Sequence, residues 1–454
     1  MELAEYLESI LLKFKDSRVV KKTKKLVENI IEHKSIRLWT ISADKAEYDR
    51  SKQLLDGSLK SVLDEEKTAK AIRDKSVGAL GDKERLIVMH DPCDIRKKYA
   101  EEMEKIGKVR DLDGNLINGY STFNTVAVDV SGKKLYPVDI KVYSNGDEHY
   151  VTTKEMKEYE KGKLQESERS KEIEQFIAEG SAINLPRLSK SQLRVVSQAF
   201  KEKNPEISLC HVLDRQFDGQ DYFEFIDQEL EDEFVIRCKV SRNSNKVAVD
   251  PQTKKTVALK LKDVEFEHSH CDIIKKLKVK KKVYQNAKCL LEWGILTIDE
   301  VDYSIIRVTL QDSQAKPIYK QPMLLITNIK VKKAEQARAV YRIYLMRAKI
   351  ESVFKFLKGV LGWEEFQVRD YESIKNIIAL AFFIGGYFYE IESELTENPT
   401  ISLIAQLGGG KGKVTRYYFL EGLKKLLIHK SVQRFINEQE IPTKTLTEML
   451  AFVT

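Results

Sequence analysis

The spacing of apolar residues divides the chain into regions of different character. Residues 1 to about 80 show helical spacing and no strand-like alternation, which predicts a small helical N-terminal domain. From Arg85 onward, short strand-like apolar runs are separated by charged stretches of helical spacing. Helical patterns return after residue 372 and continue to the C-terminus. Strands interspersed with helices in this way predict an α/β protein.

Two of the apolar runs end in aspartate. The run RLIVMH leads into Asp91, and Pro92 is expected to end that strand. The run ISLCHVL leads into Asp214. Such strands can deliver carboxylates to the rim of a sheet, although Asp-Pro is also a good turn former. Residues 121–130 and 133–144 predict two more strands, which would form an antiparallel meander with the first.

Residues 233–321 predict strand after strand, separated by turn residues. We interpret this stretch as a β-rich subdomain inserted into the α/β core. In its most basic strand, Lys276, Lys278 and Lys280 alternate with apolar residues and would share one side of a sheet. A phosphate backbone could lie there. The alternative is an edge strand that lysines protect from aggregation.

The stretch from Tyr341 to Lys358 predicts an amphipathic helix with a second, chemically unusual face. Its apolar stripe is formed by Ile343, Met346, Ile350, Val353, Phe354 and Leu357. About a quarter turn away, Tyr344, Arg347, Glu351 and Lys358 cluster on the helical wheel. This face can be a solvated surface with an Arg-Glu pair. It can also be a metal-binding carboxylate flanked by phosphate-binding cations, which requires further acidic ligands elsewhere.

Composition indicates a globular protein of several domains. The chain has 454 residues, 42% hydrophobic and 32% charged, with a net charge of +7. The charge excess is mild, so basic clusters such as Arg18 to Lys25 matter more than the total. Five scattered cysteines without CxxC spacing favour free thiols in a reducing cytoplasm. No secretory signal is apparent, and the apolar run 377–389 is too short to span a bilayer, so no membrane is expected.

Two other motifs resemble known binding sites but lack part of the required pattern. His268, His270 and Cys271 could suggest zinc, but no fourth ligand has a matching spacing. The run LGGGKGKVTR departs from a phosphate-binding loop because Leu407 stands where the first glycine belongs. The remaining set is Asp91, Asp214 and Glu351. Convergent carboxylates are suitable ligands for two Mg²⁺ ions, which prefer oxygen and can act together on a phosphodiester.

These motifs resemble the DDE transposases of bacterial insertion sequences, and within them the IS-four family. That family's signature is Tyr, two residues, Arg, three residues, Glu, six residues, Lys, and Tyr344, Arg347, Glu351 and Lys358 have this spacing. The segments HDPCDIRKKYAEEMEKIGKVRD and HVLDRQFDGQDYFEF resemble those around the family's two aspartates. The β-rich insertion also falls where the family carries one.

The resemblance implies an RNase H-like core, a mixed sheet flanked by helices, made of residues 81–232 and 322–372. Residues 1–80 would be a helical DNA-binding domain, 233–321 the β-rich insertion and 373–454 a helical C-terminal region. Asp91, Asp214 and Glu351 would be catalytic and would hold Mg²⁺, for which Mn²⁺ can substitute. Tyr344, Arg347 and Lys358 would grip phosphates near the scissile bond.

The implied activity is cut-and-paste DNA transposition by a cytoplasmic enzyme that associates with the nucleoid when acting. Its partners would be double-stranded DNA, both terminal inverted repeats and target, and a second copy of the chain on that DNA. Two alternatives stay open. One is a DNA-binding descendant of a transposase that has lost catalysis, and the other is a structure-specific nuclease on the same core.

Overall fold

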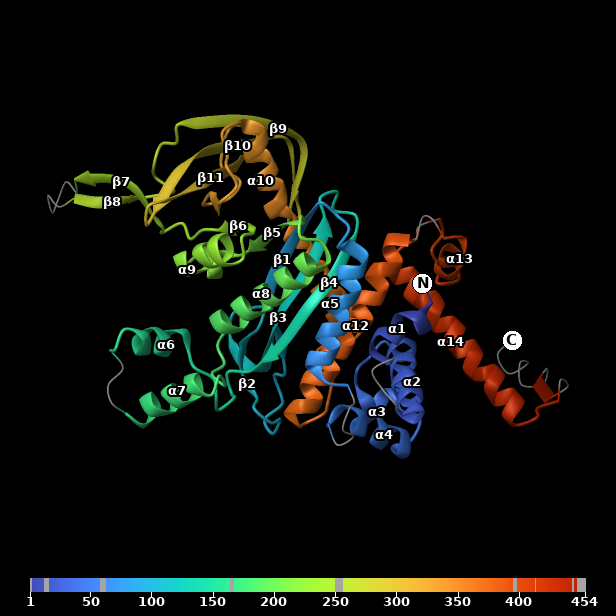
Figure 1. The fold of residues 1–454 in the computed structure, drawn as a ribbon. Coiled ribbons are helices and arrows are strands. Elements are labelled where there is room, and N and C mark those ends of the chain that lie inside the picture. Colours follow the sequence, from blue (N-terminus) through green and yellow to red (C-terminus); the bar gives the residue numbers. More distant parts are fainter. Residues whose placement is uncertain are drawn as a thin grey trace.

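A large mixed sheet forms the centre of the molecule (Figure 1). The computed structural model describes residues 2–11, 16–57, 63–163, 167–249, 256–394, 398–412, 414–442 and 445–446. The sheet has ten strands in the order β2-β3-β1-β5-β6-β12-β11-β10-β9, with β4 paired to β3. They are β1 (Arg85–Arg96), β2 (Gly107–Arg110), β3 (Leu116–Asp129), β4 (Leu135–Tyr143), β5 (Ser208–Leu213), β6 (Glu233–Arg237), β9 (His268–Val279), β10 (Lys282–Ile298), β11 (Val301–Gln311) and β12 (Met323–Thr327).

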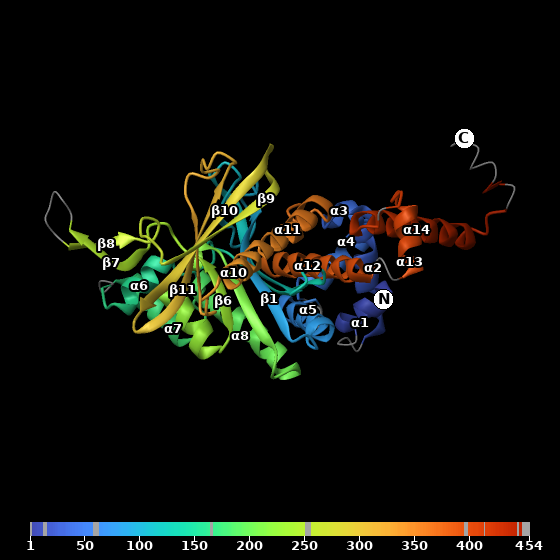
Figure 2. The ribbon, with the colours of Figure 1, turned by 90° about the horizontal axis from the view of Figure 1, so that it is seen from above.

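Strand direction changes across this sheet. The predicted meander is confirmed, because β3 runs antiparallel to both β1 and β4. Strands β1, β5 and β6 are parallel to one another, and β12, β11, β10 and β9 continue the sheet in antiparallel fashion. Much of the β-rich stretch therefore belongs to the same sheet as β1. Strands β7 (Asn243–Val249) and β8 (Thr256–Lys260) pair separately and project from one end (Figures 1 and 2).

The expectation that Pro92 ends the first strand is wrong. Strand β1 pairs with β5 only up to Met89, but it pairs with β3 as far as Arg96. The carbonyls of Asp91 and Cys93 accept hydrogen bonds from β3 side chains, so the proline nitrogen between them faces away from β3. Because β5 has already diverged on that side, the missing N–H leaves no ladder bond unmade.

The prediction that Lys280 lies within a basic strand is also wrong. Val279 and Lys282 are paired residues of β9 and β10, so Lys280 and Lys281 form a two-residue hairpin turn. Lys280 has a φ of +53°. The turn lacks the Asn-Gly or Asp-Gly that usually marks such a hairpin, so the run of lysines concealed it. Lys276 and Lys278 are exposed on β9, the edge strand.

Helices cover the sheet and build both terminal regions, as the α/β prediction requires. The N-terminal helices are α1 (Leu3–Leu11), α2 (Ser17–His33), α3 (Leu38–Ile41), α4 (Lys45–Leu55) and α5 (Glu65–Leu80). Aspartate side chains accept hydrogen bonds from first-turn amides at the starts of α2, α4 and α5, which explains where these helices begin. The central helices are α6 (Thr153–Glu160), α7 (Glu168–Ala178), α8 (Leu185–Lys203) and α9 (Gln220–Glu224), the last continued by a π-helical turn.

The C-terminal half contributes α10 (Ala334–Met346), α11 (Ala348–Val360), α12 (Tyr371–Glu394), α13 (Pro399–Leu407) and α14 (Arg416–Glu438). By length and composition α12 could cross a membrane, but 89% of its apolar window is buried inside the protein. It packs against α5 and β4 and is therefore a core helix. The proposed boundaries between domains stay a prediction.

Residues of β1 alternate between two different cores. Ile87, Met89 and Ile95 pack in a cluster with α10, α11 and α12. Leu86 and Val88 point to the opposite face, where they pack with α8. Because side chains alternate along a strand, Asp91 belongs to the face covered by α10 and α11.

Trp363 fixes α11 to α12. Its side chain is fully buried, stacks between Phe354 of α11 and Phe382 of α12, and donates from Nε1 to the carbonyl of Ile378 at 3.1 Å. The aromatic contacts and the hydrogen bond together set the position of α11 over the sheet.

Replacing Trp363 with alanine should lower the free energy of unfolding by about 3–5 kcal/mol, because a large cavity opens and the Ile378 carbonyl loses its donor. Denaturant unfolding monitored by circular dichroism measures the change. Trp363→Phe should cost less, since most of the apolar volume remains. A loss below about 1 kcal/mol for Trp363→Ala would show that α11 is held by other contacts.

Candidate active site

Asp91 and Asp214 lie side by side where β1 and β5 diverge. The last paired residues of the two strands are Met89 and Val212, so the two aspartates fall on the same level two residues further on. Asp214 directly follows β5, as predicted from the sequence. Parallel neighbours at one level point to the same face, so both carboxylates lie beneath α10 and α11.

The predicted helix from Tyr341 to Lys358 is interrupted at Arg347. Helix α10 ends at Met346 and α11 begins at Ala348. Around the junction, the amide of Arg347 donates to the carbonyl of Tyr344 and that of Ile350 to the carbonyl of Arg347, a tighter i to i−3 pattern. The apolar stripe is confirmed, since five of its six residues are buried and Met346 packs against the core.

Arg347 joins the three predicted carboxylates. Its Nη2 lies 3.0 Å from Asp91 Oδ1 and 3.6 Å from Asp214 Oδ2, and its Nη1 lies 2.9 Å from Glu351 Oε1. The structure therefore brings Asp91, Asp214 and Glu351 around one guanidinium. Arg347 is 15% exposed, whereas Glu351 is 60% exposed and forms the outer side of the cluster.

Tyr344 and Arg237 complete the surroundings of Asp214. The Tyr344 hydroxyl donates to Asp214 Oδ1 at 3.2 Å, and Arg237 Nη1 lies 3.9 Å from the same oxygen. Sequence analysis missed Arg237. It ends β6, and the pairing of Leu213 with Ile236 puts it on the level of Asp214. The sequence pattern that predicted the two aspartates, a polar residue at the end of a buried strand, could also have identified Arg237.

Lys358 lies beside this cluster and does not contact the three carboxylates. Its ammonium donates to the carbonyl of Asp94 and forms an ion pair with Glu364 at 2.9 Å. Glu364 also pairs with Arg96 at 3.2 Å. Lys276, Lys278 and Lys280, at the β9–β10 hairpin, form no contact with the cluster among the described residues.

Burial and like charge shape the ionisation of the cluster. Burial raises the pKa of Asp91 to about 6; Arg347 opposes this shift, and Asp214 and Glu351 add to it. Burial also raises the pKa of Tyr344 to about 12, with a further contribution from the Asp214 carboxylate. Tyr344 is therefore a neutral hydrogen-bond donor.

A buried polar chain supports the opposite face of the same strands. His90 Nε2 lies 2.8 Å from His211 Nδ1, and His211 Nε2 lies 3.0 Å from Asp232 Oδ2. Asp232 also accepts from Ser197 and pairs with Lys201 of α8. Burial and the neighbouring His211 lower the pKa of His90, so its ring is neutral. Sequence analysis missed this chain because its members are distant in sequence and hidden within apolar strands.

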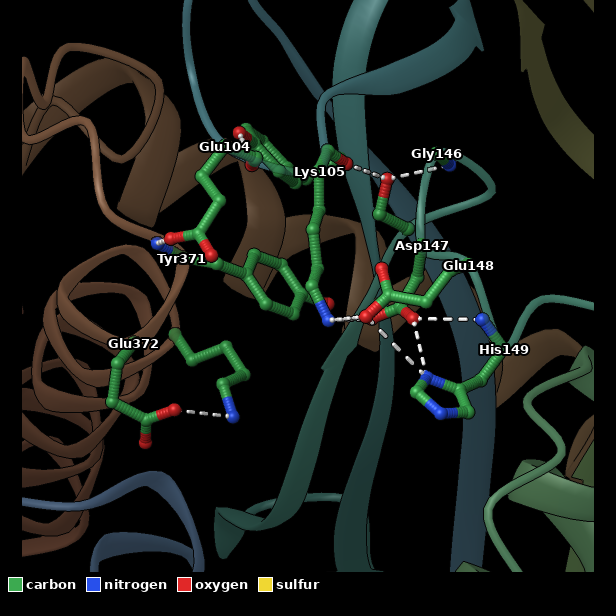
Figure 3. Close-up of polar contacts among 11 residues, drawn as sticks. Glu104, Lys105, Gly146, Asp147, Glu148, His149, Tyr371 and Glu372 are labelled. Atoms are coloured by element: carbon green, nitrogen blue, oxygen red, sulfur yellow. Dashed lines mark hydrogen bonds and ion pairs between the residues drawn. The ribbon is translucent and has the colours of Figure 1, made fainter. Parts of the chain in front are cut away.

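The three carboxylates offer only oxygen donors, as a hard divalent cation requires. Among the described residues, three ligand atoms lie within 4.8 Å of one another only at Asp147, Glu148 and His149 (Figure 3). There, Lys105 pairs with Asp147 at 3.1 Å and with Glu148 at 3.0 Å, while His149 contacts Asp147 at 3.2 Å. Both carboxylates are thus already ion-paired with Lys105. The cluster ties the loop after β4 to the segment before β2.

The raised pKa of Asp91 predicts a pH-dependent contribution to stability. The folded-state pKa of about 6 exceeds the usual value of about 3.9 in an unfolded chain. Neutral Asp91 therefore favours folding, and this contribution is complete below about pH 4 and lost as the pH rises to about 6. In EDTA at pH 7.5, Asp91→Asn should raise the free energy of unfolding by at most about 3 kcal/mol.

Denaturant unfolding of both proteins at several pH values checks this. The advantage of Asp91→Asn should shrink as the pH falls from about 6 to 4, because the wild-type carboxyl becomes neutral as well. A variant less stable than the wild type at pH 7.5 would contradict the argument.

In a comparison with known protein families, residues 210–384 match the family of transposase DDE domains. The segment extends from β5 into α12 and contains Asp214, Tyr344, Arg347, Glu351 and Lys358, while Asp91 lies outside it. No curated protein matches the chain. The matched segment covers less than half of the chain, and it supports a DDE transposase that acts on DNA.

Proposed function

We propose that this protein is a Mg²⁺-dependent DNA transposase that cleaves the ends of an insertion sequence and joins them to target DNA. One observation carries the proposal: a single guanidinium, Arg347, contacts Asp91, Asp214 and Glu351 together. Two of these carboxylates lie in the segment that matches transposase DDE domains.

Two further features support an RNase H-like core of the IS-four type. The central sheet is mixed, with antiparallel pairing from β4 through β3 to β1 and parallel pairing from β1 through β5 to β6, and helices flank it, as the resemblance implies for such a core. The spacing of Tyr344, Arg347, Glu351 and Lys358 is that of the IS-four signature.

Asp91, Asp214 and Glu351 would hold Mg²⁺, with Mn²⁺ as a possible substitute, because their donors are all oxygens and share one cation already. When bound, such ions supply an activated water or 3′-hydroxyl and stabilise the leaving oxygen of a phosphodiester. Asp91 must be deprotonated to act as a ligand, which its raised pKa makes dependent on pH.

The cationic side chains and the tyrosine hydroxyl around the carboxylates would bind phosphates. Arg347 presents a planar fork suited to phosphate oxygens, and the neutral Tyr344 hydroxyl can donate. Lys358 adds a point charge next to the carbonyl of Asp94. We also assign phosphate contacts to Lys276, Lys278 and Lys280, which are exposed at the β9–β10 hairpin.

A homodimer on DNA is part of the proposal. Helix α14 exposes Ile428, Val432 and Phe435 at 40%, 48% and 52% of their surfaces. Their spacing of four and three residues aligns them on one face of the helix. An exposed apolar stripe of this kind favours association with another copy of the helix.

Replacing Glu351 with glutamine should lower metal-dependent cleavage of DNA that carries the element's ends by more than the 10- to 100-fold typical of an outer-shell change, because a direct ligand is lost. DNA binding in EDTA should stay within about twofold, since one carbonyl oxygen replaces one carboxylate oxygen at an exposed position. Gel assays with Mg²⁺, Mn²⁺ or EDTA measure both properties.

Glu335→Gln is the matched control, because Glu335 is an exposed acid on the neighbouring helix α10. It should cleave like the wild type. Normal cleavage by Glu351→Gln would contradict the proposal. A wild-type protein that binds DNA but cuts it with neither metal would be an inactive descendant, and one that cuts without joining would be a nuclease.

Replacing Val432 and Phe435 with glutamate should convert the dimer on DNA to a monomer, because two charges would be buried at the interface. Light scattering of the protein–DNA complex counts the chains. Leu112→Glu with Leu116→Glu, at two other exposed apolar positions, should leave the count at two. Two chains per complex in the α14 variant would exclude this stripe as the contact.

A further inference from the structure

A basic groove lies between the two ends of the chain. It is lined by α2, α4 and α14, and its lining includes eight cationic side chains against two acidic ones. The lining therefore carries a net charge of +6, from eight cations less two acids, whereas the whole chain carries +7. In Figures 1 and 2 these helices lie beyond α12, at the opposite end of the molecule from the β9–β11 strands.

Helix α2 contributes a regular stripe of charge. Arg18, Lys21, Lys22 and Lys25 lie within about 100° of one another on the helical wheel, beside the buried face that contains Val19, Leu26 and Ile30. Like charges four residues apart destabilise a helix by about 0.2–0.5 kcal/mol per pair. A stripe that only kept the helix soluble would be expected to interleave acids with these cations.

Five of these eight cations have no ion-pair partner in the part of the chain that the structure describes. No described carboxylate forms an ion pair with Lys21, Lys22, Lys24, Lys25 or Arg50 of α4. Three lining cations are paired: Arg18 with Asp16 and Arg434 with Glu438, both acids outside the lining, and Lys430 of α14 with the lining acid Glu28. The uncompensated charges converge from two helices on one hollow, which is the arrangement that binds a polyanion.

Helix α14 is held against α2 by two ion pairs, Lys34 with Glu421 at 2.6 Å and Lys430 with Glu28 at 3.1 Å. Lys430 and Arg434, four residues apart, face the groove. On the helical wheel they lie roughly opposite the stripe of Ile428, Val432 and Phe435. One helix can therefore serve the groove and a second copy of the chain at the same time.

We propose that this groove binds the phosphate backbone of duplex DNA and that the C-terminal helix α14 forms one of its walls. The inference rests on the proposed function, since a transposase must hold DNA on both sides of the bond it cuts. Duplex DNA carries a regular array of phosphates that lysines at helical spacing can neutralise, with release of counterions. No base-specific contact is required at this surface.

Replacing Lys21 and Lys25 with alanine should lower the affinity for a labelled duplex DNA by on the order of 10- to 100-fold at low salt. The slope of log affinity against log salt concentration should fall by about two, one phosphate contact for each lysine. Lys430→Ala with Arg434→Ala should act in the same direction. Fluorescence anisotropy in EDTA measures binding without any contribution from catalysis.

Lys157→Ala with Lys161→Ala is the matched control, because these exposed lysines, one on α6 and one directly after it, have the same spacing outside the groove. Their salt slope should equal that of the wild type. The midpoint of thermal unfolding of Lys21→Ala with Lys25→Ala should stay equal or rise, because a repulsive pair is removed. A fall in both stability and affinity would assign these lysines a structural role and overturn the inference.

Other outcomes separate this inference from the proposed function. If the wild type binds duplex DNA and the groove variants bind it equally well, the groove inference fails and the proposed function stands. If the wild type does not bind duplex DNA, the proposed function fails. Preference of the groove for duplex RNA or for polyglutamate over duplex DNA would also overturn the DNA assignment.

Discussion

Arg347 offsets part of the repulsion among three carboxylates that meet at a half-buried position. Removing charge from water is costly unless it is paired, and burial raises the pKa of Asp91 to about 6 even though Arg347 opposes that shift. Several parts of the fold meet this requirement together. The register of β1 and β5 aligns two aspartates, and the tightened turn between α10 and α11 presents the guanidinium. Glu351 follows one helical turn later.

Both faces of the strands that carry the aspartates are fixed. On one face, Trp363 links α11 to α12 and so determines where Glu351 stands. On the other, the chain from His90 through His211 to Asp232 connects β1, β5 and α8 by hydrogen bonds that tolerate little displacement. Rigid support of this kind keeps charged groups at defined separations, which is what a site for cations and phosphates needs.

The sequence predicts the composition of the site better than its geometry. Strand ends at Asp91 and Asp214, and the helical spacing of Tyr344, Arg347 and Glu351, are local patterns, so they can be seen without coordinates. The continuation of β1 past Pro92, the turn at Lys280 and the break at Arg347 depend on which neighbour pairs with each residue, and local pattern does not contain that information. Arg237, the histidine chain and the wall of α14 are assembled from distant segments. They become visible only in three dimensions.

Pro92 has a further consequence for how the molecule behaves among other copies of itself. Beyond Met89, β1 pairs with no described strand on the β5 side, and unpaired strand edges recruit strands from other chains and lead to aggregation. A proline at this edge offers no N–H to an incoming strand. The end of β1 beside the carboxylates is therefore protected against intermolecular β-pairing.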